Sequence, residues 1–130
     1  MRLLLLCILV CSTTLAQEQT CLPERPIFPN YPPIARGAFV QGRVEADFDI
    51  DSKGRAQNVS FWVGHRMLQQ AIRDVLEQAT FPDRCFGSRH YIRYEFKLKA
   101  DASSPFGQTN KFVLPDTFEI EFNNYRFPSF

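Results

Sequence analysis

Residues 42–63 show the alternation of apolar and polar side chains that is typical of a half-buried β-hairpin. In the first half the apolar positions are Val44, Ala46, Phe48 and Ile50, and the charged positions between them are Arg43, Glu45, Asp47 and Asp49. The following Asp51-Ser52-Lys53-Gly54 contains a carboxylate and a glycine, both typical of turns. Strand-like alternation resumes over Ala56–Val63. We therefore predict two antiparallel strands joined by a tight turn.

From Gly64 the spacing of the apolar positions becomes helical. The apolar stripe consists of Leu68, Ala71, Ile72, Val75, Leu76 and Ala79. The opposite face is polar, and the pattern stops near Phe81, just before Pro82. We predict one main amphipathic helix whose stripe covers the inner face of a sheet. A short helical turn is also expected around Ile34–Arg36, because Pro33 suits a first helical position.

Two further strands are predicted after the helix. Residues Tyr91–Lys99 alternate again, with apolar side chains at Ile92, Tyr94, Phe96 and Leu98. Residues Thr117–Asn123 repeat this pattern, and their apolar side chains are Phe118, Ile120 and Phe122. The intervening Asp101–Asn110 is rich in Ser, Gly and polar residues, and we interpret it as a linker.

These elements predict an α+β fold: a three- to four-stranded antiparallel sheet with one main helix, and a short N-terminal helix, packed on one face. A right-handed crossover from the helix places the third strand beside the first, which gives the order 2-1-3. The charges agree, since the acidic side chains of the first strand then face the basic side chains of the third, namely Glu45, Asp47 and Asp49 against Arg93, Lys97 and Lys99. We further predict that Thr117–Asn123 pairs with Tyr91–Lys99, which extends the order to 2-1-3-4.

The first residues have the features of a signal peptide: a basic Arg2, an apolar run over Leu3–Val10, and small residues around Ala16. The apolar run is shorter than the roughly 18 residues of a membrane span, so an uncleaved anchor is the less favoured alternative. Lipidation at Cys11 is another, also less favoured. The predicted organisation is a signal peptide (1–16), a Pro-rich extended lead-in (17–33), one domain (34–100), and a linker with an additional C-terminal strand (101–130).

Export changes the interpretation of charge and of cysteines. The chain has 15 basic and 14 acidic residues, and loss of Arg2 makes the two numbers equal. A nucleic-acid partner is therefore not expected, because such binding depends on a basic surface. Cys7 and Cys11 leave with the signal peptide, so Cys21 and Cys85 remain in an oxidising compartment. We predict that they form a disulfide worth about 4 kcal/mol; two free thiols are the alternative.

Few residues suit catalysis or metal binding. The candidates are His65, His90 and the two remaining cysteines. Cysteine and histidine could form a thiol nucleophile with its base or a metal site, but the spacing of these residues supports neither. The acidic residues at 45, 47 and 49 fall on the solvent side of their strand, where pairing with basic neighbours is the simpler interpretation. Trp62 also falls on the exposed side and is a candidate contact residue. We predict a binding protein without catalytic residues, metal or cofactor, rather than an enzyme.

An ordered set of short motifs resembles the TonB C-terminal domain family. The N-terminal motifs are Tyr31-Pro32, Ala35-Arg36, Gly42-Arg43-Val44, Phe48-Asp49-Ile50-Asp51, Gly54 and Val59. The later ones are Gly64-His65-Arg66-Met67-Leu68, Ala71, Val75 and Phe81-Pro82. The similarity spans Tyr31 to about Lys99. The family also has a membrane anchor and a long Pro-rich spacer; here we expect a signal peptide and a lead-in that reaches only about 40 Å.

The resemblance implies a periplasmic module associated with TonB-dependent outer-membrane transport, which takes a transporter's extended N-terminal segment as an added strand. In the order 2-1-3 the third strand has the free edge, so we predict partner-binding residues at Tyr91, Arg93, Glu95 and Lys97. Another periplasmic protein is an alternative partner. The alternative function is structural, with two chains exchanging C-terminal strands in a dimer. The mature chain is expected to be a monomer or such a dimer, without a membrane span.

Overall fold

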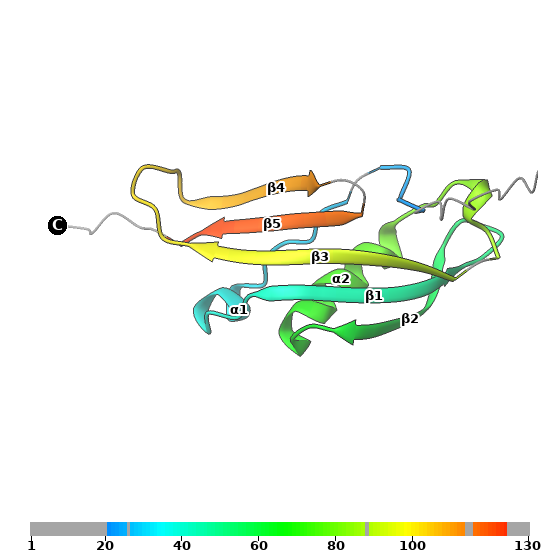
Figure 1. Ribbon diagram of the computed structural model, residues 1–130, viewed down its shortest axis with the longest axis horizontal. Coiled ribbons are helices and arrows are strands. Elements are labelled where there is room, and N and C mark those ends of the chain that lie inside the picture. Colours follow the sequence, from blue (N-terminus) through cyan, green and yellow to red (C-terminus); the bar gives the residue numbers. More distant parts are fainter. Residues whose placement is uncertain (1–20, 26, 88, 114–115, 125–130) are drawn as a thin grey trace, which may run out of the picture.

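The computed structural model describes residues 21–25, 27–87, 89–113 and 116–124. The predicted signal peptide lies outside these residues. Within them the elements are α1 (Pro33–Gly37), β1 (Gly42–Ile50), β2 (Ala56–Val63), α2 (Arg66–Gln78), the short 3-10 helix η1 (Asp83–Cys85), β3 (Arg89–Lys99), β4 (Gly107–Val113) and β5 (Thr117–Asn123). The strands form one sheet in the order β2-β1-β3-β5-β4, and Figure 1 shows α2 lying across one face of it. The predicted α+β fold with one main helix is confirmed.

The β1–β2 hairpin forms as predicted, and the side chain of Asp51 organises its turn. One carboxylate oxygen of Asp51 accepts hydrogen bonds from the backbone nitrogens of Lys53 and Arg55, at 2.8 and 2.9 Å. Gly54 has a φ of +77°, and a Cβ at this position would lie 2.7 Å from the carbonyl oxygen of Phe81. The backbone conformation and the close approach therefore both require glycine at position 54.

Helix α2 buries the apolar stripe that the sequence predicts. Leu68, Ile72 and Leu76 are fully buried and Val75 nearly so. Leu68, Ile72 and Leu76 belong to one hydrophobic core with inward-facing residues of the sheet, including Val44, Phe48, Ile92, Tyr94 and Phe96. The core forms because alternate residues of each strand and every third or fourth residue of the helix meet at the same surface.

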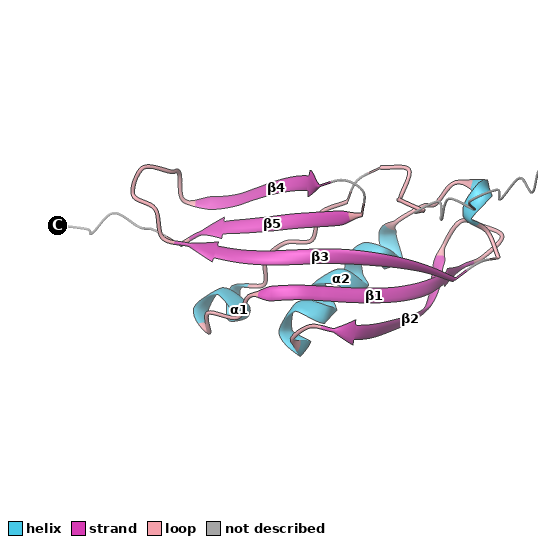
Figure 2. Cartoon of the chain, in the orientation of Figure 1, coloured by secondary structure: helices cyan, strands magenta, loops and turns pink. Residues whose placement is uncertain are grey.

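The C-terminal region differs from the prediction in two respects. Part of the segment interpreted as a linker belongs to β4, which pairs antiparallel with β5. β5 pairs with β3, as predicted, but the two strands are parallel, so the sheet is mixed rather than wholly antiparallel. The chain reverses after β3, runs through β4 in the outermost position, and turns back so that β5 fills the place between them (Figure 2). Two reversals make β5 parallel to β3.

The composition of β4 explains why the sequence pattern did not predict it. Gln108 and Asn110 pair with the buried Phe122 and Ile120 and so lie on the inner side of the sheet, where a strand usually carries apolar residues. Gln108 bonds instead to the lead-in: its Oε1 accepts from the nitrogen of Tyr31 and its Nε2 donates to the carbonyl of Pro29, both at 2.8 Å. The lead-in therefore supplies polar backbone partners where apolar packing would otherwise be needed.

The Pro-rich lead-in is fixed to the domain near both ends. Cys21 and Cys85 form the predicted disulfide, with Cα atoms 5.8 Å apart. At the other end the ring of Tyr31 meets the ring of Phe96 edge-on, with centroids 5.1 Å apart, and its hydroxyl donates to the carbonyl of Val40. Burial raises the pKa of Tyr31 to about 12. The described part of the lead-in thus belongs to the folded domain.

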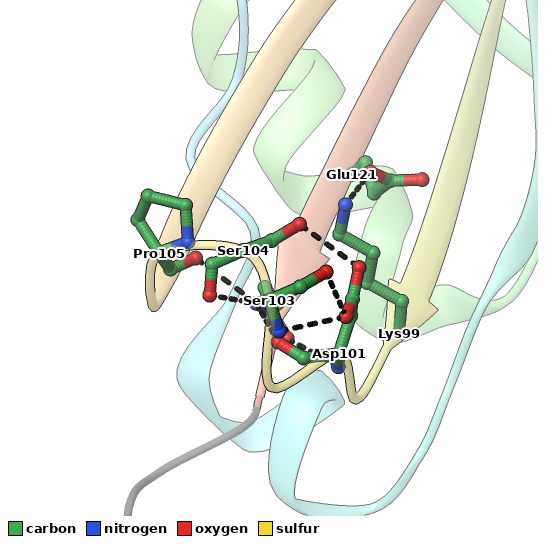
Figure 3. A network of polar contacts seen from close by, with 7 residues as sticks. Lys99, Asp101, Ser103, Ser104, Pro105 and Glu121 are labelled. Atoms are coloured by element: carbon green, nitrogen blue, oxygen red, sulfur yellow. Dashed lines mark hydrogen bonds and ion pairs between the residues drawn. The ribbon is translucent and has the colours of Figure 1, made fainter.

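The loop between β3 and β4 is held by Asp101 and Asn123. The Asp101 carboxylate accepts hydrogen bonds from the backbone nitrogen and the hydroxyl of Ser103, at 2.9 and 2.7 Å, and from the hydroxyl of Ser104 at 2.9 Å (Figure 3). The buried amide nitrogen of Asn123 lies 2.9 to 3.0 Å from the carbonyls of Asp101, Ser104 and Pro105. The hydrogen bonds from the two serines lower the pKa of Asp101 to about 2, because they favour the ionised carboxylate.

We expect Cys85→Ala to lower the free energy of unfolding by about 2 to 5 kcal/mol, because the disulfide no longer restricts the unfolded chain. Urea denaturation of the variant and the wild type measures this difference. A Cys21→Ala/Cys85→Ala double variant controls for the free thiol that the single change leaves and should be destabilised to a similar extent. Non-reducing mass mapping that found both thiols free in the wild type would contradict the prediction.

Leu76→Ala should lower the free energy of unfolding by about 2 to 5 kcal/mol, because it opens a cavity between α2 and the sheet. Glu77→Ala, at an exposed neighbouring position of the same helix, is the matched control and should change it by less than about 0.5 kcal/mol. Denaturant unfolding of both variants provides the comparison. A loss below about 1 kcal/mol for Leu76→Ala would mean that the buried face of α2 is wrongly assigned.

The lowered pKa of Asp101 predicts a specific dependence of stability on pH. Its ordinary value is about 3.9, so the folded state gains from the ionised carboxylate above about pH 4, and this gain is lost as the pH falls through the folded-state value of about 2. Asp101→Asn should therefore lower the urea midpoint at pH 7, and the difference from the wild type should shrink between about pH 4 and pH 2. A constant difference across this range would show that the carboxylate charge is not responsible.

Candidate partner-binding edge

The four predicted site residues lie together on the solvent side of β3, opposite the face that α2 covers. Tyr91, Arg93, Glu95 and Lys97 alternate with the buried Ile92, Tyr94 and Phe96. β3 is an interior strand: it pairs antiparallel with β1 over Arg89–Phe96 and parallel with β5 over Arg93–Lys99. Three of the four predicted residues thus lie in the ladder with β5, and Tyr91 lies beyond its end.

Arg93 joins β3 to β1 on this face. Its Nε lies 3.1 Å from Oε1 of Glu45, and its guanidinium donates to the hydroxyl of Tyr91 at 2.8 Å. The hydrogen bond to Tyr91 is the main reason that the pKa of Arg93 is raised. Burial raises the pKa of Tyr91, although the hydrogen bond with Arg93 opposes this effect. The predicted opposition of acidic and basic side chains across these two strands is present at Glu45 and Arg93. Lys97 and Lys99 face β5 instead, and Arg89 pairs with Asp47 and Asp49.

Lys97 and Lys99 join β3 to β5. The Lys97 Nζ lies 2.8 Å from Oε1 of Glu119, and the Lys99 Nζ lies 2.9 Å from Oε1 of Glu121. The hydrogen bond between the first pair raises the pKa of Lys97 and lowers that of Glu119. Such exposed pairs contribute about 0 to 1 kcal/mol each. They therefore favour the observed register more than they hold the strand in place.

The carboxylates of β1 each have a basic partner, which agrees with the pairing role that the sequence indicates. Arg89 on β3 lies 2.8 Å from Oδ2 of Asp47 and 3.2 Å from Oδ1 of Asp49. Hydrogen bonds from Asn58 and then from Arg89 lower the pKa of Asp49. Among the described residues, no group of three or more His, Cys, Asp or Glu side chains is arranged to hold a metal ion.

β5 is held to β3 mainly through its inner face. Phe118 stacks on Tyr94 with ring centroids 5.0 Å apart, and the ring of Phe112 on β4 lies 4.8 Å from that of Phe118. Ile120 is fully buried and Phe122 nearly so. Burying each of these large side chains contributes about 1.5 to 3 kcal/mol, well above the contribution of the exposed ion pairs. The strand that fills the edge of β3 is thus an integral part of the core.

The remaining candidate residues have local contacts. His65 precedes α2, and its Nδ1 accepts from the nitrogen of Met67 at 3.2 Å. His90 Nε2 lies 2.7 Å from the carbonyl oxygen of Cys85. Trp62 is 73% exposed, as the alternation of β2 predicts. In the part of the chain that the structure describes, no helix is long and apolar enough to cross a membrane.

Asn123 is the residue of this site that sequence reasoning missed. It is 2% exposed and ties β5 to the loop that leads into β4. It also extends the ladder between β5 and β3 to its last pair, Lys99 with Asn123. The available signal was weak: an amide ends the alternation of apolar and acidic residues in Thr117–Asn123, and nothing in this pattern distinguishes a buried amide from an exposed one.

The two outer edges of the sheet differ in regularity. β2 is irregular, because its register with β1 shifts twice and Asn58 has a φ of 52°. Such bulges interrupt the edge that another strand would need. β4 pairs with β5 without a register shift, and its only charged side chain is that of Lys111. The described residues thus offer a disturbed edge at β2 and a regular one at β4.

Residues 28–98 match the family described as Gram-negative bacterial TonB protein C-terminal. The chain is also similar to the solution NMR structure of the Pseudomonas aeruginosa TonB C-terminal domain, with 24% sequence identity and a TM-score of 0.49 over 62% of this chain and 88% of that one. No match was found among curated proteins. Because the family match covers more than half of the sequence, from the lead-in to β3, the chain belongs to the Gram-negative bacterial TonB protein C-terminal family.

Proposed function

We propose that this protein is a periplasmic binding module of TonB-dependent outer-membrane transport, which receives an extended segment of a partner protein as an added strand on β3. The observation that supports this proposal best is the outer edge of β3. That edge accepts a parallel strand within the chain itself, and this strand, β5, lies beyond the family match over residues 28–98. The partner is the N-terminal segment of an outer-membrane transporter or another periplasmic protein.

β5 indicates the chemistry of a segment that fits this edge. Its inner positions are the apolar Phe118, Ile120 and Phe122. Its outer positions are acidic and meet the ammonium groups of Lys97 and Lys99. A partner segment that alternates apolar and acidic residues would reproduce both sets of contacts, since backbone pairing supplies affinity and alternate side chains supply specificity.

β5 also limits access to this site. A partner that pairs with Arg93–Lys99 must first displace it, and the three apolar side chains it leaves exposed are each worth about 1.5 to 3 kcal/mol. The partner offsets this cost only if it buries equivalent side chains. Tyr91 lies beyond the β5 ladder, so this end of β3 is where an incoming segment makes first contact in our proposal.

The test compares binding of a synthetic peptide with the sequence of residues 116–124 to the full-length protein and to a form that ends at Ala100. We expect the shortened form to bind it at least about tenfold more tightly, because the attached β5 competes at a high effective concentration. Isothermal titration calorimetry measures both affinities, with a scrambled peptide as control. Equal affinities would contradict the occlusion of the edge by β5.

A locked variant keeps this test valid if the shortened form does not fold. Glu95 and Glu119 face one another in the β3–β5 ladder, so a Glu95→Cys/Glu119→Cys variant can fix the two strands by a second disulfide. The locked protein should lose all binding of the peptide, whereas the Glu95→Ser/Glu119→Ser control should retain the weak binding of the full-length protein. Undiminished binding to the locked form would exclude the edge of β3 as the site.

The alternative function, assembly through exchanged C-terminal strands, uses the same edge. Here β5 pairs with β3 of its own chain, whereas an exchanged dimer would place β5 on the β3 of a second copy. The molecular mass of the purified protein at micromolar concentration separates the two arrangements.

A further inference from the structure

The turn after α1 places a phenylalanine where backbone geometry favours glycine. α1 ends with Ala38 as its cap, and Phe39 then adopts a φ of 55°. The nitrogen of Phe39 donates to the carbonyl of Arg36 at 3.2 Å, and the nitrogen of Val40 donates to that of Ala35 at 2.8 Å. This pair of hydrogen bonds defines the motif that ends many helices with a left-handed residue, usually glycine. A bulky residue in this conformation is an outlier.

Packing does not compensate for this conformation. The Phe39 side chain is 77% exposed, the highest value among the large exposed hydrophobic residues that the structure describes, and Ile34 on the same helical turn is 73% exposed. Strained residues that persist without a structural reason are often found at binding sites, and aromatic side chains contribute strongly to binding when a partner buries them. The backbone conformation of Phe39 therefore lowers the stability of the free protein, and burial of its side chain does not offset this loss.

Phe39 lines two surface hollows at the end of β3. One, of about 230 Å³, is lined by Phe39, Gln41, Leu98, Lys99, Ala100 and Asn124. The other, of about 530 Å³, shares Phe39, Ala100 and Asn124 and adds Pro33, Arg36 and Gly37. None of these lining residues is acidic. Among the lining residues that the structure describes, a segment lying over Phe39 would meet apolar groups and basic charges.

Arg36 is the cation of this surface that has no acidic partner among the described residues. Its guanidinium lies over the ring of Phe122, 4.0 Å from the centroid, and its Nε is buried without a hydrogen-bond partner. By contrast, Lys99 in the other hollow is paired with Glu121. A guanidinium that contacts an aromatic ring without an acidic partner can still bind a carboxylate through its N–H groups, in a fixed geometry.

We propose that the Phe39 surface, formed by Arg36, Phe39, Leu98 and Ala100, is a docking site for a partner peptide that carries an acidic residue next to an apolar one. The carboxylate pairs with Arg36, and the apolar side chain lies against Phe39. Charge complementarity selects this occupant, because the described residues that line the two hollows include basic groups and no acidic ones. The site lies at the end of β3, beside the β3–β5 ladder, and binding there requires no displacement of β5.

The test begins with a random decapeptide library displayed on phage and panned against the immobilised wild-type protein. Enriched peptides are synthesised and titrated by calorimetry against the wild type, Phe39→Gly, Arg36→Gln and Val63→Ala. Val63 is the control, since it is an exposed hydrophobic residue on β2 that lines neither hollow. We expect enriched peptides to contain an acidic residue beside an apolar one, and Phe39→Gly and Arg36→Gln to weaken binding by about tenfold or more. Val63→Ala should leave it unchanged.

A second measurement distinguishes a binding role of Phe39 from a structural one. Because glycine adopts a positive φ without strain, Phe39→Gly should raise the urea midpoint while it weakens peptide binding. A lower midpoint would assign Phe39 to the stability of the fold and overturn the proposal. Binding that Phe39→Gly leaves intact, or a library without enriched peptides, would also overturn it.

Two further forms of the protein exclude other occupants. If residues 125–130 of the same chain covered the surface, only a form ending at Asn124 would bind the peptides. If a second copy of the chain covered it, the wild type would be a dimer and Phe39→Gly a monomer. Either result would overturn the proposal. Peptides that bind the locked Glu95→Cys/Glu119→Cys variant as tightly as the wild type would support it, because the lock closes the edge of β3 and leaves the Phe39 surface open.

Discussion

The buried inner face of the sheet is the constraint on which the rest of this structure depends. Alternate residues of β1, β3 and β5 form one apolar layer, which α2 and the lead-in cover. Since neighbouring residues of a strand point to opposite sides, burial of Phe48, Tyr94 and Ile120 determines which residues face solvent. The ion pairs between β1, β3 and β5 then follow, because a shift of one residue would bury the charges and expose the core.

The elements that bury an apolar stripe could be predicted from the sequence. The alternation in Gly42–Ile50 and the helical spacing from Leu68 to Leu76 each have one physical explanation, so the hairpin and the main helix follow from residue patterns. The disulfide could be predicted from the two cysteines that remain after the predicted signal peptide. β4 could not be predicted in this way. Its inner side meets the backbone of the lead-in through Gln108, and a hydrogen bond between residues so distant in sequence leaves no periodic signal.

The candidate sites were predictable to different degrees. The solvent-facing residues of β3 and the strand beside them could be named, because acidic and basic positions matched across the two strands. The direction of β5 could not, since parallel and antiparallel pairing bury the same alternate residues. The Phe39 surface gave no signal either: the left-handed conformation of Phe39 and the position of Arg36 over Phe122 arise only when the chain is folded.

The disulfide between Cys21 and Cys85 also determines how the chain carries mechanical tension. A pull on the segment before Cys21 passes through the sulfur atoms to Phe86 and then directly into β3. The residues between the two cysteines, which include α1, β1, β2 and α2, form a closed covalent loop and cannot be extended by that pull. The load therefore falls on the backbone hydrogen bond from Gly87 to Ile50 and then on the ladders that β3 makes with its neighbours. In this protein the strand that carries the candidate site is also the one that any such force reaches first.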